Sequence, residues 1–132
     1  MADFATGTWQ LVETENFDAY MKAVGVGLVM RKMAATIKPT QEITVENGRW
    51  KIKTISTLKT TEIDFVIGDV FEETTADGRK VQTVMSMDGQ KLMATQKGDV
   101  DSTICREWSG DTMVMKLTAQ DVVCTRTYKR SK

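Results

Sequence analysis

Near the N-terminus, apolar residues recur with the spacing of an α-helix in two consecutive segments. The first segment contains the series Phe17, Tyr20, Met21 and Val24. The second segment contains the series Val29, Met30, Met33 and Ile37. Spacing of this kind gives a helix one apolar face. We therefore predict two short helices, which form a helix–turn–helix because the sequence Gly25-Val26-Gly27 separates them.

The predicted helices have recognisable ends. Asn16 precedes the first apolar series and is a suitable N-cap, because its side chain can accept a hydrogen bond from a backbone N–H of the first turn. Pro39 follows the second series, and the residue before a proline disfavours helical backbone. Before the first helix, residues 7–12 are predicted to form a strand with Trp9 and Leu11 on one face.

After Pro39 the polar–apolar pattern changes to a period of two, which is typical of β-strands. Pairs of turn-forming residues divide this region: Asn47-Gly48, Gly68-Asp69, Asp77-Gly78, Asp88-Gly89, Gly98-Asp99 and Gly110-Asp111. Their spacing predicts an antiparallel meander and about ten strands in the whole chain. An up-and-down barrel or a sandwich would protect the edges of so many strands.

Alternate residues of a strand share one face, so the direction of a polar side chain follows from its apolar neighbours. The last predicted strand places Arg126 and Tyr128 on the same face as Cys124. An earlier strand places Arg106 on the same face as Trp108. Because both faces also carry apolar residues, we expect them to be interior. Two arginines are therefore predicted to point inward.

An unpaired arginine inside a protein is costly, because its guanidinium stays charged. Two interpretations remain open for Arg106 and Arg126. The alternation of faces could slip at a bulge, or the arginines could pair with carboxylates that the pattern does not locate. Alternatively, they line a wet cavity and bind an anionic ligand. A guanidinium suits the second role because its planar fork can hydrogen-bond a carboxylate.

Composition narrows the class of protein. The length of 132 residues favours one domain spanning residues 1–132. The formal net charge is zero, which argues against a nucleic acid as the main partner. No apolar run is long enough for a transmembrane helix, and the first residues lack the pattern of a signal peptide. We therefore expect a cytoplasmic protein.

The chain offers little for catalysis. It contains no histidine, which removes the commonest general base and metal ligand, so we predict no catalytic residue, no metal site and no cofactor. Cys105 and Cys124 fall on opposite faces of their strands, so no disulfide is expected. The acidic sequences Glu13-Thr14-Glu15 and Glu72-Glu73 are interpreted as solvated surface.

Over its whole length the sequence resembles the cytosolic fatty-acid-binding proteins. The N-terminal resemblance lies in Gly7-Thr8-Trp9-Gln10-Leu11 and Asn16-Phe17-Asp18-Ala19-Tyr20-Met21. Further segments resemble the heart, adipocyte and peripheral-myelin branch: Gly25-Val26-Gly27, Lys38-Pro39-Thr40, Glu73-Thr74-Thr75-Ala76-Asp77-Gly78-Arg79-Lys80 and Val123-Cys124-Thr125-Arg126-Thr127-Tyr128. The resemblance implies an all-β calycin fold, a ten-stranded antiparallel up-and-down barrel with a helix–turn–helix lid between the first two strands.

The resemblance also implies a function and a site. It implies an intracellular, non-enzymatic carrier of a long-chain fatty acid. Arg126 and Tyr128 would contact the ligand carboxylate directly, and Arg106 would do so directly or through water. The residues implied to line the cavity or its portal are Phe17, Tyr20, Met21, Ala34, Pro39, Leu58, Asp77, Arg79, Ile104, Met115 and Leu117.

Departures from the family pattern leave the ligand open. Leu58 replaces a portal phenylalanine, Ala94 replaces a common histidine, and the turn at Gly98-Asp99 is one residue shorter. These changes affect the expected chain-length preference and the portal, and they leave the carboxylate residues intact. Because the retinoic-acid-binding branch has a similar site, a retinoid carrier remains an alternative.

Three basic residues of the predicted lid suggest another activity. Lys22, Arg31 and Lys32 resemble a basic cluster of the adipocyte branch. They could simply be a solvated helix face. They could also allow transient contact with anionic membranes, or nuclear import. A membrane-interaction protein is therefore the second functional hypothesis, and a monomer is expected in either case.

Overall fold

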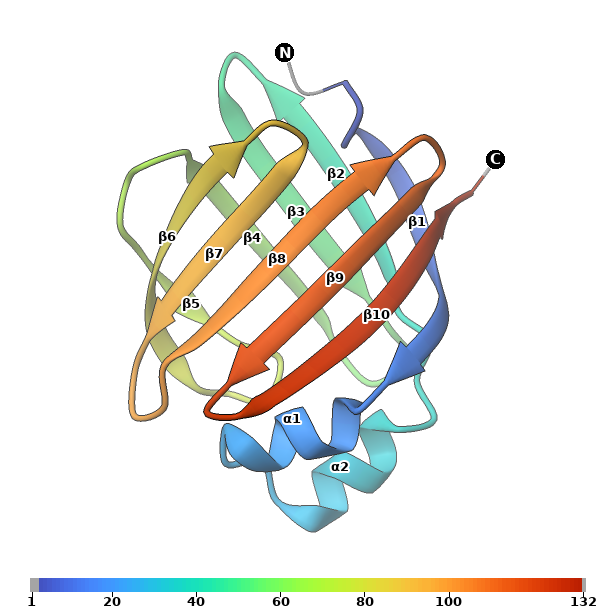
Figure 1. Ribbon diagram of the computed structural model, residues 1–132, viewed down its shortest axis with the longest axis vertical. Coiled ribbons are helices and arrows are strands. Elements are labelled where there is room, and N and C mark those ends of the chain that lie inside the picture. Colours follow the sequence, from blue (N-terminus) through green and yellow to red (C-terminus); the bar gives the residue numbers. More distant parts are fainter. Residues whose placement is uncertain (1–2, 132) are drawn as a thin grey trace.

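The computed structural model describes residues 3–131, which form a nearly closed β-barrel with two helices across one end (Figure 1). The strands are β1 (Gly7–Glu15), β2 (Thr40–Glu46), β3 (Arg49–Ile55), β4 (Thr60–Val66), β5 (Phe71–Thr74), β6 (Lys80–Asp88), β7 (Lys91–Lys97), β8 (Ser102–Ser109), β9 (Thr112–Ala119) and β10 (Val122–Arg130). The helices are α1 (Phe17–Ala23) and α2 (Leu28–Ala34), and together we call them the lid. The predicted ten-stranded barrel with a lid between its first two strands is confirmed.

The strands form one antiparallel sheet in the order β4-β3-β2-β1-β10-β9-β8-β7-β6-β5. Strands β4 and β5 stand at the two ends of this order, so no ladder of hydrogen bonds joins them within residues 3–131. Side chains fill this gap, since the rings of Phe65 and Phe71 stack with their centroids 5.5 Å apart. The backbone N–H of Gly68 also donates to the carbonyl of Met85 at 2.9 Å.

The predicted alternation of faces is present in β8, β9 and β10. Trp108, Met113 and Cys124 are almost completely buried on the inward face, whereas Glu107 and Lys129 on the outward face are exposed. Burying a large apolar side chain contributes roughly 1.5–3 kcal/mol. The inward faces therefore hold the barrel together, and the polar residues on them are directed inward by the same alternation.

The lid corrects two details of the sequence prediction. Asn16 stands at the predicted N-cap, but its side chain makes no capping hydrogen bond and donates instead to the carbonyl of Val123 at 3.3 Å. The second helix ends at Ala34, earlier than the apolar spacing predicts. Backbone hydrogen bonds of the tighter i to i−3 type follow the helix, such as the bond from Ile37 N–H to the Ala34 carbonyl at 3.1 Å.

Only part of the apolar series faces the interior: Met30 of α2 and Ile37, just after α2, line an internal cavity. No residue of α2 is fully buried, and Val29 keeps 75% of its surface exposed. Leu28 and Met33 are also exposed, because α2 contacts the barrel less closely than α1, whose Tyr20 and Met21 are buried. The periodic pattern therefore predicted the helix correctly, and two of its four positions, Met30 and Ile37, face the interior while Val29 and Met33 are exposed.

Opposite the lid, Arg130 at the end of β10 contacts the N-terminal segment. Its guanidinium lies 4.3 Å from the centroid of the Trp9 ring, pairs with Asp111 at 3.0 Å and donates to the carbonyl of Phe4 at 3.1 Å. Gly7 makes room for it, because a Cβ there would lie 2.5 Å from Nη1 of Arg130. With a φ of +140°, this position favours glycine on backbone grounds as well.

Candidate ligand-binding cavity

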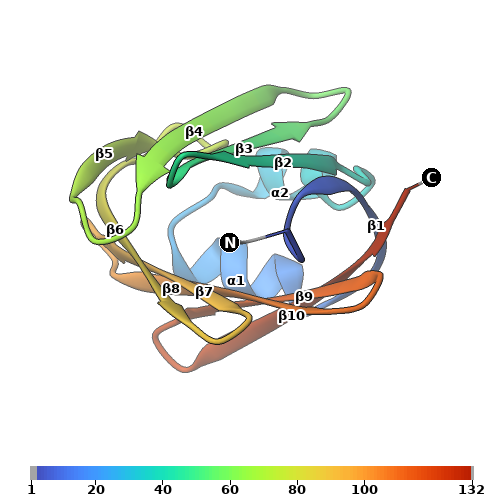
Figure 2. The same cartoon turned by 90° about the horizontal axis from the view of Figure 1, so that it is seen from above.

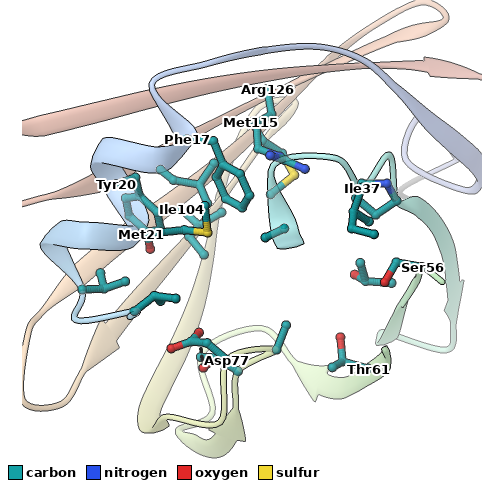
Figure 3. Close-up of a pocket in the computed structure, with 18 of the residues that line it drawn as sticks. Phe17, Tyr20, Met21, Ile37, Ser56, Thr61, Asp77, Ile104, Met115 and Arg126 are labelled. Carbon is teal, nitrogen blue, oxygen red and sulfur yellow. Dashed lines mark hydrogen bonds between the residues drawn. The ribbon is translucent and has the colours of Figure 1, made fainter. Parts of the chain in front are cut away.

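The barrel contains a cavity of about 250 Å³ that reaches from the lid to the inward arginines. Figure 2 looks along the barrel and shows α1 and α2 lying across its far end. In the close-up, the ring of Phe17 lies beside Arg126 and Met115, while Asp77 and Thr61 stand on the opposite wall (Figure 3). The cavity therefore lies between the lid, the β8–β10 wall and the β4–β5 side of the barrel.

All residues that the family resemblance implies for the carboxylate site, the cavity or the portal line this cavity. They are Phe17, Tyr20, Met21, Ala34, Pro39, Leu58, Asp77, Arg79, Ile104, Arg106, Met115, Leu117, Arg126 and Tyr128. The strand residues among them point inward by alternation, and three more come from α1; Ala34 comes from α2, and the remaining four lie in connections between elements, namely Pro39, Leu58, Asp77 and Arg79. Their roles in binding a ligand remain predictions.

Strand register brings the two arginines together. Met115 of β9 is paired with Arg106 of β8 on one side and with Arg126 of β10 on the other. Because neighbouring strands lie about 4.8 Å apart, the two arginines stand about 10 Å apart at their backbones. Both are buried, with 6% and 5% of their surface exposed, and Tyr128 is buried beside them. Three polar groups from two strands thus meet at one end of the cavity.

The hydrogen bonds of these groups leave donors unused. Arg106 donates from Nε to the side-chain oxygen of Gln41 at 3.2 Å, and Arg126 donates from Nη1 to Thr14 at 3.2 Å. The hydroxyl oxygen of Tyr128 accepts from Gln41 at 3.3 Å, so its own proton stays available. Within residues 3–131, no carboxylate lies within 4.0 Å of the guanidinium of Arg106 or Arg126. We call Arg106, Arg126 and Tyr128 the donor pole.

Electrostatics at the donor pole favour an anion. Burial lowers the pKa of Arg106 below its ordinary value, and the nearby Tyr128 and Glu73 oppose that shift. The guanidinium of Arg126 lies 3.8 Å from the centroid of the Phe17 ring, which provides a cation–π contact but no negative charge. An anion bound here would compensate the buried positive charges, which burial deprives of hydration. This arrangement supports the cavity interpretation over a slip in strand alternation.

The sequence prediction for Glu73 is wrong. Glu73 is half-buried and lines the cavity, whereas Glu72 is exposed as predicted. One oxygen of Glu73 accepts hydrogen bonds from Thr83 at 2.9 Å and from Gln96 at 3.1 Å. A signal was available, because Phe71, Glu73 and Thr75 alternate along one strand face. Two adjacent acidic residues conceal it, since they suggest a solvated surface.

The lid is fixed to the cavity wall by polar contacts. The hydroxyl of Tyr20 donates to Ser102 at 3.2 Å, and burial raises the pKa of that hydroxyl. At the portal, Arg79 donates to Asp77 at 2.7 Å. Burial alone would raise the pKa of Asp77, but hydrogen bonds from Arg79 and Thr75 outweigh it and hold the pKa below its ordinary value. The portal therefore carries an ion pair rather than a free charge.

The basic lid residues differ in their surroundings. Arg31 pairs with Asp18 at 3.0 Å and donates to the carbonyl of Val26 at 2.7 Å, so its guanidinium is engaged within the lid. Lys22 and Lys32 are exposed. The outward positive charge of the lid therefore comes from the two lysines.

The two cysteines are interpreted as packing residues. Cys105 and Cys124 are free thiols, as predicted. Burial raises the pKa of Cys124 to about 11, which keeps this thiol protonated. Within the described part of the chain, no group of three His, Cys, Asp or Glu residues is placed to hold a metal ion. None of the helices among residues 3–131 has the length and apolar character needed to cross a bilayer.

Comparison with known proteins identifies close relatives. Residues 6–131 match the model of the lipocalin / cytosolic fatty-acid binding protein family. The squid Doryteuthis pealeii has a similar protein, the sodium/calcium exchanger regulatory protein 1, which is 54% identical over 130 residues and 98% of both chains. The solved structure of the REP1-NXSQ fatty acid transporter is 54% identical over 96% of both chains, with a TM-score of 0.94. The Schistosoma mansoni fatty acid binding protein, solved with arachidonic acid, is 36% identical over 99% of this chain and 98% of its own, with a TM-score of 0.97.

Proposed function

The chain belongs to the lipocalin / cytosolic fatty-acid binding protein family, and from this premise we propose that it is an intracellular carrier that reversibly binds one long-chain fatty acid. The observation that carries the proposal is the donor pole. Two buried guanidinium groups, which have no carboxylate partner among residues 3–131, and a free tyrosine proton meet in a cavity with largely apolar walls. A ligand with a carboxylate head and a long apolar tail satisfies both parts of the cavity.

The proposed binding is driven by the tail and oriented by the head. A chain of roughly 15 methylenes, at about 0.8 kcal/mol each, gives a gross favourable term of about 12 kcal/mol. Ordering the chain and losing its translational freedom offset much of this term. The net affinity expected is micromolar or tighter. Arg126 and Tyr128 would bind the carboxylate directly, and Arg106 directly or through water.

The same reasoning gives the finer features of the proposal. We place the protein in the cytoplasm, as a monomer whose ligand is a lipid rather than a nucleic acid, and we assign it no catalytic step. Within the family we propose the heart, adipocyte and peripheral-myelin branch, because several segments of the sequence resemble it. A retinoid carrier is the alternative on the same fold, because retinoic acid also ends in a carboxylate.

Direct binding measurements test the proposed function. We expect delipidated protein to bind one palmitate per chain with micromolar or tighter affinity in isothermal titration calorimetry. We expect retinoic acid to bind more weakly and to be displaced by palmitate. Native mass spectrometry of protein from its natural source should show a fatty acid as the bound molecule. Failure of any long-chain fatty acid to bind would contradict the proposal, and tighter binding of retinoic acid would favour the retinoid alternative.

Membrane contact through the lid is a second candidate function. It is favoured by the exposed apolar side chains of Leu28, Val29 and Met33, which lie on the lid with Lys22 and Lys32. Anionic lipid attracts lysines, and apolar side chains can enter the interface. The related squid protein is named for regulation of a sodium/calcium exchanger.

Vesicle co-sedimentation separates this candidate from simple carriage. We expect delipidated protein to bind vesicles that contain phosphatidylserine at low salt and to be released at high salt, because the attraction of exposed charges is screened. Lys22→Gln combined with Lys32→Gln should reduce this binding. Lys51→Gln combined with Lys53→Gln, on the outside of β3, is the matched control. Binding that ignores salt and both lysines would argue against a role of the lid.

A further inference from the structure

A second polar cluster adjoins the cavity, and two of its members, Glu73 and Gln96, line it. It consists of Glu73, Thr83, Gln96 and Ser102 and spans the neighbouring strands β5 to β8. Thr83 is paired in register with Gln96, which is paired in turn with Ser102. These three side chains are buried, with 0%, 2% and 3% of their surface exposed. The inward faces of four adjacent strands thus carry a continuous line of polar groups.

The hydrogen bonds of this cluster all run in one direction. A carboxylate can only accept, so Gln96 must donate its amide to Glu73 at 3.1 Å, and Thr83 must donate its hydroxyl proton to the same oxygen at 2.9 Å. The amide oxygen of Gln96 is then the acceptor for Ser102 at 2.6 Å. Ser102 in turn accepts from Tyr20 at 3.2 Å. Every hydroxyl proton of the cluster is therefore committed, and the series ends at Glu73.

One oxygen of Glu73 remains without a donor. Both hydrogen bonds go to Oε1, and within residues 3–131 no protein group donates to Oε2. No lysine or arginine of the described chain lies within 4.0 Å of this carboxylate either. Glu73 nevertheless lines the cavity. A methylene packed against it would remove water from a charged oxygen and provide no hydrogen bond, which is unfavourable.

We propose that Glu73 Oε2 is a second ligand subsite, which accepts a hydrogen bond from a hydroxyl group carried on the acyl chain. The preferred ligand class is then a monohydroxylated long-chain fatty acid. This inference rests on the proposed function, because it needs the carboxylate of the same ligand at the donor pole. The cavity thus has a donor pole for the anionic head and an acceptor at Glu73 for an O–H group.

The geometry places the hydroxyl partway along the chain. Glu73 stands on β5 and Arg106, at the donor pole, on β8, with β6 and β7 between them in the sheet. At about 4.8 Å per strand, their backbones are about 14 Å apart along the curved sheet. A hydroxyl next to the carboxylate would stay near the arginines, whereas one farther along the chain can reach Glu73. The preference should therefore depend on the position of the hydroxyl.

A positional series of ligands tests the inference. Calorimetry compares hexadecanoic acid with its monohydroxy isomers, in which the hydroxyl moves carbon by carbon along the chain. A hydrogen bond to a charged group should make the best isomer bind roughly tenfold tighter than the parent acid. An isomer with the hydroxyl at the second carbon should gain no such advantage. If no isomer binds more tightly than the parent acid, the proposal is overturned by the wild-type protein alone.

Two variants assign the preference to the carboxylate of Glu73. Glu73→Met keeps the length of the side chain and removes the acceptor, so the advantage of the best isomer should be lost while the parent acid still binds. Thr83→Val is the matched control, because it changes the same cluster and leaves Oε2 in place, so the advantage should remain. Persistence of the advantage in Glu73→Met would overturn the assignment. If wild-type protein binds neither the parent acid nor any isomer, the proposed function itself fails, which is distinguishable from the absence of a hydroxyl preference.

Discussion

Replacing Arg126 by Gln is expected to weaken the binding of palmitate by about 10- to 100-fold. The guanidinium of Arg126 is buried in the cavity and has no carboxylate partner among residues 3–131. A hydrogen bond to a charged group contributes about 1.5–3 kcal/mol, and each 1.4 kcal/mol corresponds to a tenfold change in affinity. Glutamine can still donate, but it carries no charge and lacks the guanidinium fork. Calorimetric titration of delipidated protein measures the change.

The head group of the ligand separates recognition from structural damage. Hexadecanol has the same tail as palmitate and no carboxylate, so its affinity should change by less than about threefold. Lys129→Gln is the matched control, because it removes one positive charge from the same strand at an exposed position outside the cavity. It should bind palmitate like the wild type. An equal loss of acid and alcohol would indicate that Arg126 acts through its contact with Phe17 of the lid, and would contradict a direct role in carboxylate binding.

The donor pole could be predicted from the sequence because alternation on a regular strand is strict. Arg126 and Tyr128 follow Cys124 at steps of two, and no bulge interrupts β10 opposite β9. The register shift of this region lies in β1, between Leu11 and Glu13, where it leaves the inward face of β10 unchanged. Local pattern was therefore sufficient to orient these side chains. Their proximity to Arg106 depends on the pairing of β8, β9 and β10, which the meander of turns also predicts.

Other features depend on information that a local pattern lacks. The inward position of Glu73 was not predicted, because two adjacent acidic residues suggest a solvated surface even though Glu73 alternates with Phe71. Its hydrogen-bond partners Thr83 and Gln96 also come from other strands, which a local pattern does not show. The apolar spacing of α2 predicts a helix but not how closely that helix packs on the barrel. The exposure of its side chains therefore could not be predicted from the sequence. The gap between β4 and β5 could not be predicted either. Turn residues mark where strands end, but they do not show whether neighbouring strands come close enough to pair.

The substitution with the largest expected effect on stability is Phe65→Ala, because Phe65 lies at the gap between β4 and β5. Phe65 is 2% exposed and stands between two other rings, with centroids 5.9 Å from Trp50 and 5.5 Å from Phe71. Removing a buried phenylalanine side chain costs about 3–5 kcal/mol, because apolar burial is lost and a cavity remains. No ladder joins β4 to β5 in the described chain, so backbone hydrogen bonds cannot compensate across the gap. Urea unfolding of delipidated protein should show a lower transition midpoint with a similar slope.

Phe71 provides the matched comparison, because it lies across the gap and is only partly buried. Phe71→Ala should cost less than Phe65→Ala, since a smaller part of its surface is removed from water. The double variant should cost less than the sum of the single variants by about 0.5–1.5 kcal/mol, which is typical of the coupling between stacked rings. Additive costs would show that the two rings do not stabilise each other. If Phe65→Ala lowers the free energy of unfolding by less than about 1 kcal/mol, other contacts close the barrel. Loss of a buried ring that fills the gap should lower it by more than that.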